Sequence, residues 1–195
     1  MKSVSGYQVK TYNGSTFVRV FHQSTVINHG SSMFFKDRDI IFYNKPYKFS
    51  VMGSINERFK NNGYYEFLIN YPDGSKVHWR QMTNPLEYTN ETGMQPIDIN
   101  NSVFQGLRRV NSTKTCIKGT DYLTYWYFAI GTKEIYKEGI PGFCWNQNDN
   151  NVYKEVTLWM KIDNESVIYT SLPPLYMFSN ARKACRMLAE SLSIY

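Results

Sequence analysis

Two runs of alternating side chains, separated by a tight turn, constrain the fold more than any other feature of this sequence. They lie in YYEFLINYPDGSKVHWRQ, residues 64–81, on either side of Pro72-Asp73-Gly74-Ser75. Proline presets the φ of a turn, and glycine adopts the positive φ that closes it. One face of the first run is apolar and consists of Tyr65, Phe67, Ile69 and Tyr71. The sequence therefore predicts a β-hairpin with one face directed toward a core.

Three other stretches also have the pattern of strands. Both sets of alternate residues are fairly apolar in STFVRVFHQS, residues 15–24, which predicts a central strand of a sheet. An amphipathic strand is predicted in VYKEVTLWMKID, residues 152–163, where Val156, Leu158, Met160 and Ile162 alternate with more polar neighbours. A further strand is predicted in YLTYWYFAI, residues 122–130, followed by a tight turn at GIPG, residues 139–142.

The segments between these strands predict loops and one short helix. Val51, Ile55 and Phe59 are spaced by four residues, which predicts a short helix that Asn61-Asn62-Gly63 ends. Residues 82–112 are rich in Asn, Thr, Pro and Gly, which predicts long loops with a short strand among them.

The composition favours an all-β domain. Aromatic residues make up 16% of the 195 residues, with 16 Tyr and 12 Phe, and such residues favour half-buried sheet surfaces. The 42% hydrophobic content suffices for one core, and the length fits one domain. We therefore expect an antiparallel β-sandwich or jelly-roll-like domain over residues 1–170, followed by a C-terminal helical tail over residues 171–195.

The predicted tail has a basic first half. After Pro173-Pro174, Ser179 or Asn180 can cap a helix whose apolar residues share one face. Arg182, Lys183 and Arg186 lie in its first turns, where positive charge opposes the helix dipole. Either solvent screening makes this cost small, or an acidic protein neighbour binds this face. The second interpretation makes these three residues a predicted partner-binding site.

The motifs of common enzymes are missing from the sequence. It has no P-loop, dinucleotide fingerprint, GxSxG elbow or HExxH. Cys116, Cys144 and Cys185 have no metal-site spacing with the three histidines. A pair such as Cys144 with His78 would meet only if the fold brought it together, and a buried cysteine more often packs as a small apolar residue. We expect no catalytic residue, no metal and no cofactor.

A polar loop next to a tryptophan is the candidate ligand site. It comprises Trp145, Asn146, Asn148 and Asp149, within WNQNDNN. The loop resembles oxygen-rich calcium loops, but it has one carboxylate, and an ordinary polar turn explains it as well. A tryptophan on a strand can stack on a sugar ring, although Trp79, Trp126 and Trp159 fit core positions at least equally well.

Charge and hydropathy restrict the partners and the compartment. The formal net charge is +6, but the basic residues are dispersed, so nucleic-acid binding is not expected. The N-terminal MKSVSGYQVK lacks the apolar run of a signal peptide, and no stretch of about 18 apolar residues predicts a membrane span. We expect an intracellular or virion location.

The order of several segments resembles a known module. These segments are FVRVFHQS, YEFLINYPDGSKVHWRQMTNP, GMQPIDI, FQGLRR, YWYFAIGT, GIPG and VTLWMKI, over residues 16–163. They resemble an uncharacterised β-rich module of large DNA viruses, protists and marine invertebrates, which often lies next to fibrinogen-like or lectin-type domains. The resemblance implies a binding or structural role without an established catalytic activity.

These observations lead to two hypotheses about function. The first is a non-enzymatic structural protein, held by other subunits of a large assembly, such as a minor capsid protein of a large DNA virus. In this hypothesis the N-terminal segment and the tail are arms that contact partners. The second is a lectin-like module that binds glycans through Trp145 and the neighbouring loop.

Overall fold

The computed structural model describes residues 2–4, 6–24, 40–41, 48–87, 89, 91–99, 106–107, 140–141 and 152–172. The strands are β1 (Lys2–Val4), β2 (Tyr7–Tyr12), β3 (Ser15–Ser24), β4 (Ile40–Ile41), β5 (Lys48–Ser50), β6 (Tyr65–Asn70), β7 (Lys76–Gln81), β8 (Gln95–Asp98), β9 (Ile140–Pro141), β10 (Val152–Tyr153) and β11 (Glu155–Ile162). The helices are the 3₁₀ turns η2 (Met52–Ser54) and η3 (Glu57–Phe59) and the α-helix α1 (Ser166–Ser171).

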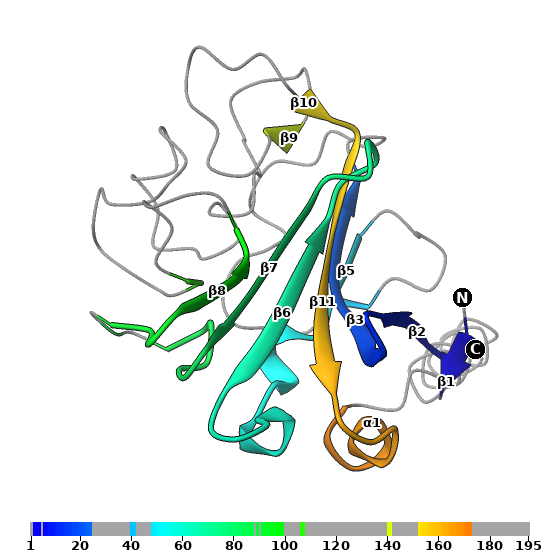
Figure 1. The fold of residues 1–195 in the computed structure, drawn as a ribbon. Coiled ribbons are helices and arrows are strands. Elements are labelled where there is room, and N and C mark those ends of the chain that lie inside the picture. Colours follow the sequence, from blue (N-terminus) through cyan, green and yellow to red (C-terminus); the bar gives the residue numbers. More distant parts are fainter. Residues whose placement is uncertain are drawn as a thin grey trace, which may run out of the picture.

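Most of these strands belong to one large antiparallel sheet (Figure 1). Its order is β1-β2-β3-β11-β6-β7-β8, and β5 pairs with both β3 and β4. A separate two-stranded ladder joins β9 and β10. The all-β prediction is therefore confirmed, whereas the sandwich or jelly-roll arrangement stays a prediction.

The β6–β7 hairpin forms as the sequence predicts. The pairing runs from Tyr65 opposite Gln81 to Asn70 opposite Lys76. In the turn, the Gly74 amide donates to the Tyr71 carbonyl at 3.1 Å, and Gly74 has a φ of 86°. The Ser75 amide donates to Asp73 Oδ1 at 2.8 Å, which is the local side-chain bond expected of aspartate in a turn.

The strands β3 and β11 lie at the centre of the sheet. One edge of β3 pairs with β2 and β5 and the other with β11, so the prediction of a central strand is confirmed. The strand β11 lies between β3 and β6. Its Val156, Leu158, Met160 and Ile162 are all buried on one face, as predicted. Trp159 is buried on the opposite face, because a central strand is covered on both sides.

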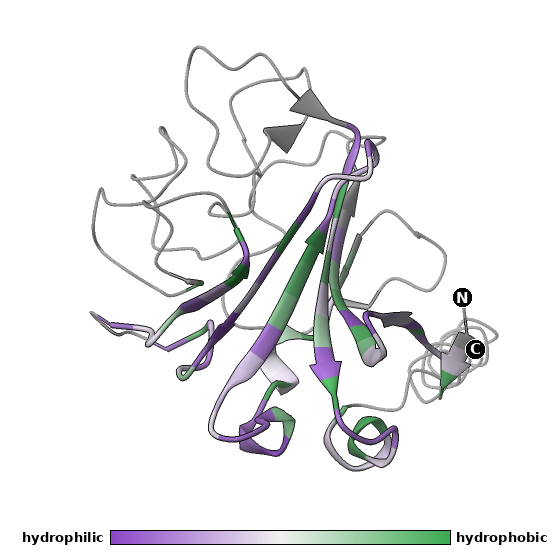
Figure 2. Ribbon diagram, viewed as in Figure 1, coloured by the Kyte–Doolittle hydropathy of each residue, from purple (hydrophilic) through white to green (hydrophobic). Residues whose placement is uncertain are grey.

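One face of the sheet, which we call the core face, holds the main hydrophobic core. Phe67 and Trp79 pack there with ring centroids 5.5 Å apart. Residues from the segment between β5 and β6, and from the segment after β11, belong to the same cluster. These residues include Val51, Met52, Ile55 and Phe59 from the segment of η2 and η3, and Ile168 and Leu172 from α1 and its end. Figure 2 shows hydrophobic and hydrophilic segments along β6 and β11.

The predicted helix over residues 50–63 forms two separate 3₁₀ turns instead. The Asn56 side chain accepts a hydrogen bond from the Arg58 amide at 3.1 Å and so begins a second turn. Asparagine competes in this way with continuous helical hydrogen bonding. The three apolar residues of the predicted helix, Val51, Ile55 and Phe59, are nevertheless all buried.

A buried glutamine fixes residues 106–107 to the end of β7. Gln81 Oε1 accepts from Trp79 Nε1 at 3.0 Å and from the Leu107 amide at 2.9 Å. Its Nε2 donates to the Thr83 carbonyl at 2.8 Å and to the Leu107 carbonyl at 2.9 Å. A Cβ on Gly106 would lie 2.7 Å from Thr92 Oγ1, so only glycine fits this close approach.

The ends of the chain are described in part. Residues 2–4 and 7–12 form β1 and β2, so the expected N-terminal arm is part of the sheet. The helix α1 at 166–171 was not expected within the β-domain. The predicted strand at 122–130 and the helical tail after residue 172 lie outside the described residues, so the division near residue 170 stays a prediction.

Candidate functional site

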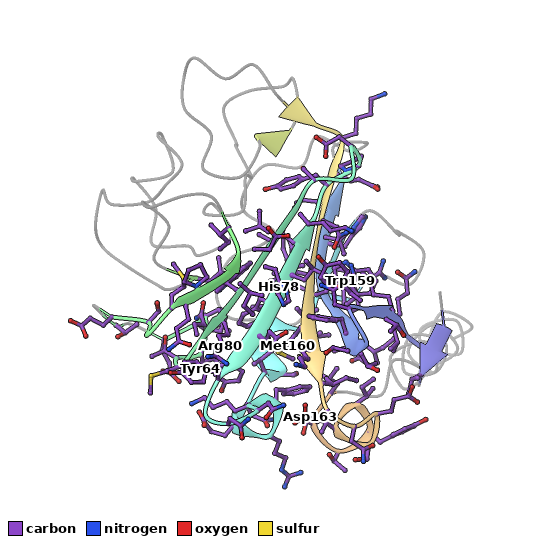
Figure 3. All side chains as sticks on the ribbon, in the orientation of Figure 1. Tyr64, His78, Arg80, Trp159, Met160 and Asp163 are labelled. Carbon is purple, nitrogen blue, oxygen red and sulfur yellow. The ribbon has the colours of Figure 1, made fainter. Side chains whose placement is uncertain are left out.

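The face of the sheet opposite the core carries most of its charged side chains, and we call it the polar face. Trp159 on β11 lies directly opposite Leu68 on β6, and Leu68 lies opposite His78 on β7. Residues directly opposite in an antiparallel ladder share a face. Trp159, Leu68 and His78 therefore form one row across three neighbouring strands, and Figure 3 labels the first and last of them.

A small apolar cluster covers the middle of this row. Phe17, Leu68 and Trp159 are buried together, and Tyr12 packs against them. The His78 ring lies edge-on to both Tyr12 and Phe17, with centroids 5.7 Å apart in each case. Because Tyr12 comes from β2, the β2–β3 hairpin reaches over the polar face as far as β7.

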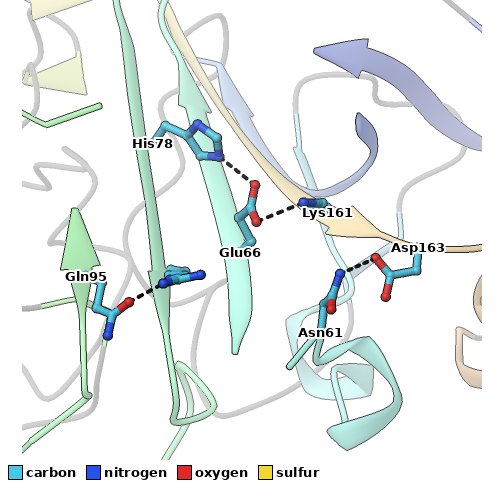
Figure 4. Close-up of polar contacts among 7 residues, drawn as sticks. Asn61, Glu66, His78, Gln95, Lys161 and Asp163 are labelled. Carbon is cyan, nitrogen blue, oxygen red and sulfur yellow. Dashed lines mark hydrogen bonds and ion pairs between the residues drawn. The ribbon is translucent and has the colours of Figure 1, made fainter. Parts of the chain in front are cut away.

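One carboxylate bonds to two side chains on this face (Figure 4). Glu66 Oε1 lies 2.9 Å from His78 Nε2, and Glu66 Oε2 accepts from Lys161 Nζ at 3.1 Å. Burial raises the pKa of the Glu66 carboxyl, but the hydrogen bonds from His78 and Lys161 outweigh it and leave the pKa below its ordinary value. Glu66 therefore stays ionised at neutral pH and connects β6 to β7 and β11.

Lys10 lies across the tryptophan of the row. Its Nζ is 4.4 Å from the centroid of the Trp159 ring and donates to Asn70 Oδ1 at 2.5 Å. Burial, and secondarily the charge of Lys76, lower the pKa of the Lys10 ammonium to about 8. Lys76 is exposed, and its Nζ lies 4.8 Å from the centroid of the Tyr12 ring. Two positive charges thus face each other across this part of the sheet.

His22 lies farther along β3 and is held uncharged. Its Nδ1 is 2.8 Å from Thr157 Oγ1. Burial, with the nearby charge of Arg19, lowers the pKa of His22 to about 4. The Glu155 carboxylate is 4.0 Å from His22 Nε2, but it is half exposed, so solvent screens its opposing effect.

Two polar atoms of the row are buried without a hydrogen-bond partner among the described residues. They are Trp159 Nε1 and His78 Nδ1, and Arg19 Nε on the neighbouring strand is a third. Trp159 is only 4% exposed and His78 only 5%. A buried donor without an acceptor costs about 1–3 kcal/mol, so such atoms ordinarily bind water or a ligand.

The arrangement is better suited to binding than to proton transfer. Both oxygens of Glu66 are already bonded, and among the described residues the free donors on this face belong to Lys10, Lys76, Arg19 and the Trp159 indole. In the described part of the chain, no group of three or more His, Cys, Asp or Glu side chains could hold a metal ion. The described helices include none long and apolar enough to cross a membrane.

The residues predicted from the sequence to bind ligands or partners lie outside the described residues. This applies to Trp145, Asn146, Asn148 and Asp149, to Arg182, Lys183 and Arg186, and to the three cysteines. The interpretation of Trp79 and Trp159 as core residues is confirmed, since both are buried. Neither ring is available to stack on a sugar, so the glycan hypothesis depends on Trp145.

The polar-face cluster was not found from the sequence. Lys10 and His78 are 68 positions apart in the printed sequence, and Trp159 follows 81 positions after His78. Only one local signal exists, the charged Arg19 inside the otherwise apolar run FVRVF. No protein-family model, curated protein or solved structure matches the chain, so the resemblance to a viral and invertebrate module stays a prediction.

Proposed function

We propose that this chain is a non-enzymatic structural protein, a subunit of a large assembly such as a minor capsid protein of a large DNA virus. In this proposal the described sheet is one layer of a β-sandwich or jelly-roll body. The predicted tail residues Arg182, Lys183 and Arg186 contact an acidic neighbouring subunit. The order of the segments that resemble the viral module supports the viral assignment.

The observation that carries the proposal is the position of the exposed apolar side chains. Met82 and Ile97, in the β7–β8 part of the sheet, are 49% and 48% exposed, and Tyr169 on α1 is 64% exposed. In Figure 1, β8 forms the left edge of the sheet, whereas α1 lies below the end of β11. Single exposed apolar residues are common, but two separated contact points suit a subunit with more than one neighbour.

The test is the mass of the particle that contains the protein. We expect the native protein in gently lysed material to sediment in a megadalton particle, and the purified chain to be much smaller. A native protein that sediments as a monomer would refute the proposal.

Two variants make this test specific. Tyr169→Ser and the double variant Met82→Ser with Ile97→Ser should each reduce incorporation into the particle. Glu87→Ser, a change at an exposed polar residue, should be incorporated normally. Equal incorporation of all three variants would show that these side chains make no subunit contact.

A further inference from the structure

We propose that the polar face binds a small oxyanion, a carboxylate or phosphate group, between Lys10, Lys76 and the indole N–H of Trp159. This inference is independent of the structural role proposed above. It rests on unpaired positive charge, an unpaired buried donor and the aromatic side chains around them.

The two ammonium groups have no internal counter-ion in the described part of the chain. There, the ion pairs involve Lys60, Lys161, His22 and His78, and no carboxylate lies within 4.0 Å of Lys10 or Lys76 Nζ. Glu66, the carboxylate that β6 contributes to the polar face, is bonded to His78 and Lys161. A half-buried cation beside a second cation is stabilised by any anion that reaches it.

The chemistry of the free groups selects an oxygen acceptor. An indole N–H and an ammonium only donate hydrogen bonds. Trp159 Nε1 is buried without a partner in the described residues. Lys10 donates one of its three ammonium protons to Asn70, which leaves two for a ligand. A carboxylate or phosphate oxygen accepts several such bonds at once, and charge-assisted bonds are the stronger ones.

The groups of the proposed site differ in exposure. Lys76 is exposed, Lys10 is about half buried, and Trp159 lies beneath Lys10. Tyr12, whose ring lies under Lys76, and Leu68 form the apolar surroundings. The anion thus meets an exposed charge first and the buried donor last, with less water competing at each step.

The indole proton of Trp159 is the direct probe. The full chain is labelled with ¹⁵N-tryptophan, the Trp159 signal is identified with Trp159→Phe, and inorganic phosphate or sodium acetate is added. We expect a saturable downfield shift of the Trp159 signal with both anions, while the Trp79 signal, already bonded to Gln81, stays in place. Sodium chloride at the same ionic strength should leave the Trp159 signal unchanged.

Three variants separate a site from general screening. Lys76→Gln removes an exposed charge, so the fold is retained, and the dissociation constants should rise about tenfold or more. Lys10→Met should abolish the shift. The matched control is Lys60→Gln, since Lys60 also lies over a ring, Tyr65, but pairs with Glu57.

Two outcomes would overturn the proposal. If chloride shifts the Trp159 signal as much as the oxyanions do, the anions only screen charge. The same conclusion follows if Lys60→Gln and Lys76→Gln change the dissociation constants equally. No shift with either oxyanion would mean that the Trp159 N–H holds only ordered water or remains unpaired. A shift with phosphate alone or acetate alone would support the site and name its ligand chemistry.

Discussion

Replacement of Gln81 by alanine gives the most direct test of how the described core is held together. The side chain is fully buried and makes four hydrogen bonds, two as acceptor and two as donor. In Gln81→Ala, the Trp79 indole, the Leu107 amide and the carbonyls of Thr83 and Leu107 lose their partner together. Residues 106–107 would then be released from β7.

The expected loss of unfolding free energy follows from these four groups. Each buried polar group without a partner costs about 1–3 kcal/mol, and water that enters the vacated space recovers part of the total. We expect a loss of about 3–5 kcal/mol, which is a large share of the 5–15 kcal/mol that is typical of a whole domain. Gln95→Ala is the matched control, because the Gln95 side chain also accepts and donates hydrogen bonds, with Arg80 and Tyr64, but is exposed.

A second variant tests the direction of each bond. In Gln81→Glu, one carboxylate oxygen still accepts from Trp79 and Leu107, but the other faces two carbonyl oxygens. Burial and this repulsion raise the pKa of the new carboxyl in the folded state. Its destabilisation is therefore fully present above that raised pKa and, measured against wild type at each pH, shrinks as the pH falls through it.

Urea denaturation followed by tryptophan fluorescence and far-UV circular dichroism measures these free energies. Amide hydrogen exchange at Leu107 reports the local release. Gln95→Ala should lose less than about 1 kcal/mol. A Gln81→Ala loss as small as that of Gln95→Ala, with protection retained at Leu107, would refute the assigned role of this glutamine.

Three further changes have defined expected results. The pKa of His22 is near its ordinary value of 6.5 in the unfolded chain but about 4 in the folded chain. Its contribution to the free energy of unfolding, of order 1–3 kcal/mol, is therefore complete above pH 6.5 and is lost as the pH falls toward 4. His22→Gln should flatten this part of the pH profile of stability measured with urea, and an unchanged profile would contradict the assignment. Trp79→Phe should cost about 1–2 kcal/mol more than Trp159→Phe, because within the described residues the Trp79 N–H has a bonded partner and the Trp159 N–H has none. Equal losses in urea denaturation would show that the Gln81 bond adds nothing. Asn70→Asp places a carboxylate beside Lys10, so by NMR titration the pKa of Lys10 should rise from about 8 toward 10.5, and a pKa that stays at about 8 would contradict the contact.

Local features of the fold could be predicted from the sequence, whereas the order of its strands could not. The β6–β7 hairpin follows from alternation and from the Pro72 to Ser75 turn, all within 18 residues of the printed sequence. Asn13-Gly14 gives the same kind of signal for the β2–β3 hairpin, with positive φ at both residues. The insertion of β11 between β3 and β6 joins segments far apart in sequence, such as Val156 opposite Gln23, and no local pattern encodes it.

The prediction for residues 50–63 was wrong for a different reason. The spacing of Val51, Ile55 and Phe59 identified residues that share a buried side, and this was correct. The same spacing does not distinguish a continuous helix from two 3₁₀ turns joined by extended residues, because both can bury the same side chains. Here Ile55, with φ −68° and ψ 127°, and Asn56, with φ −139° and ψ 178°, are both extended and separate the two turns.

The polar face also restricts how β11 can pair with its neighbours. A shift of β11 by one residue would exchange its two faces, since side chains alternate with a period of two. The ammonium group of Lys161 would then enter the core face, and Glu66 would be left half-buried without its cationic partner. Breaking a buried or partly buried pair costs more than the pair contributes when it is intact. The Glu66–Lys161 pair therefore adds little to stability in the correct register, but it makes the shifted register costly.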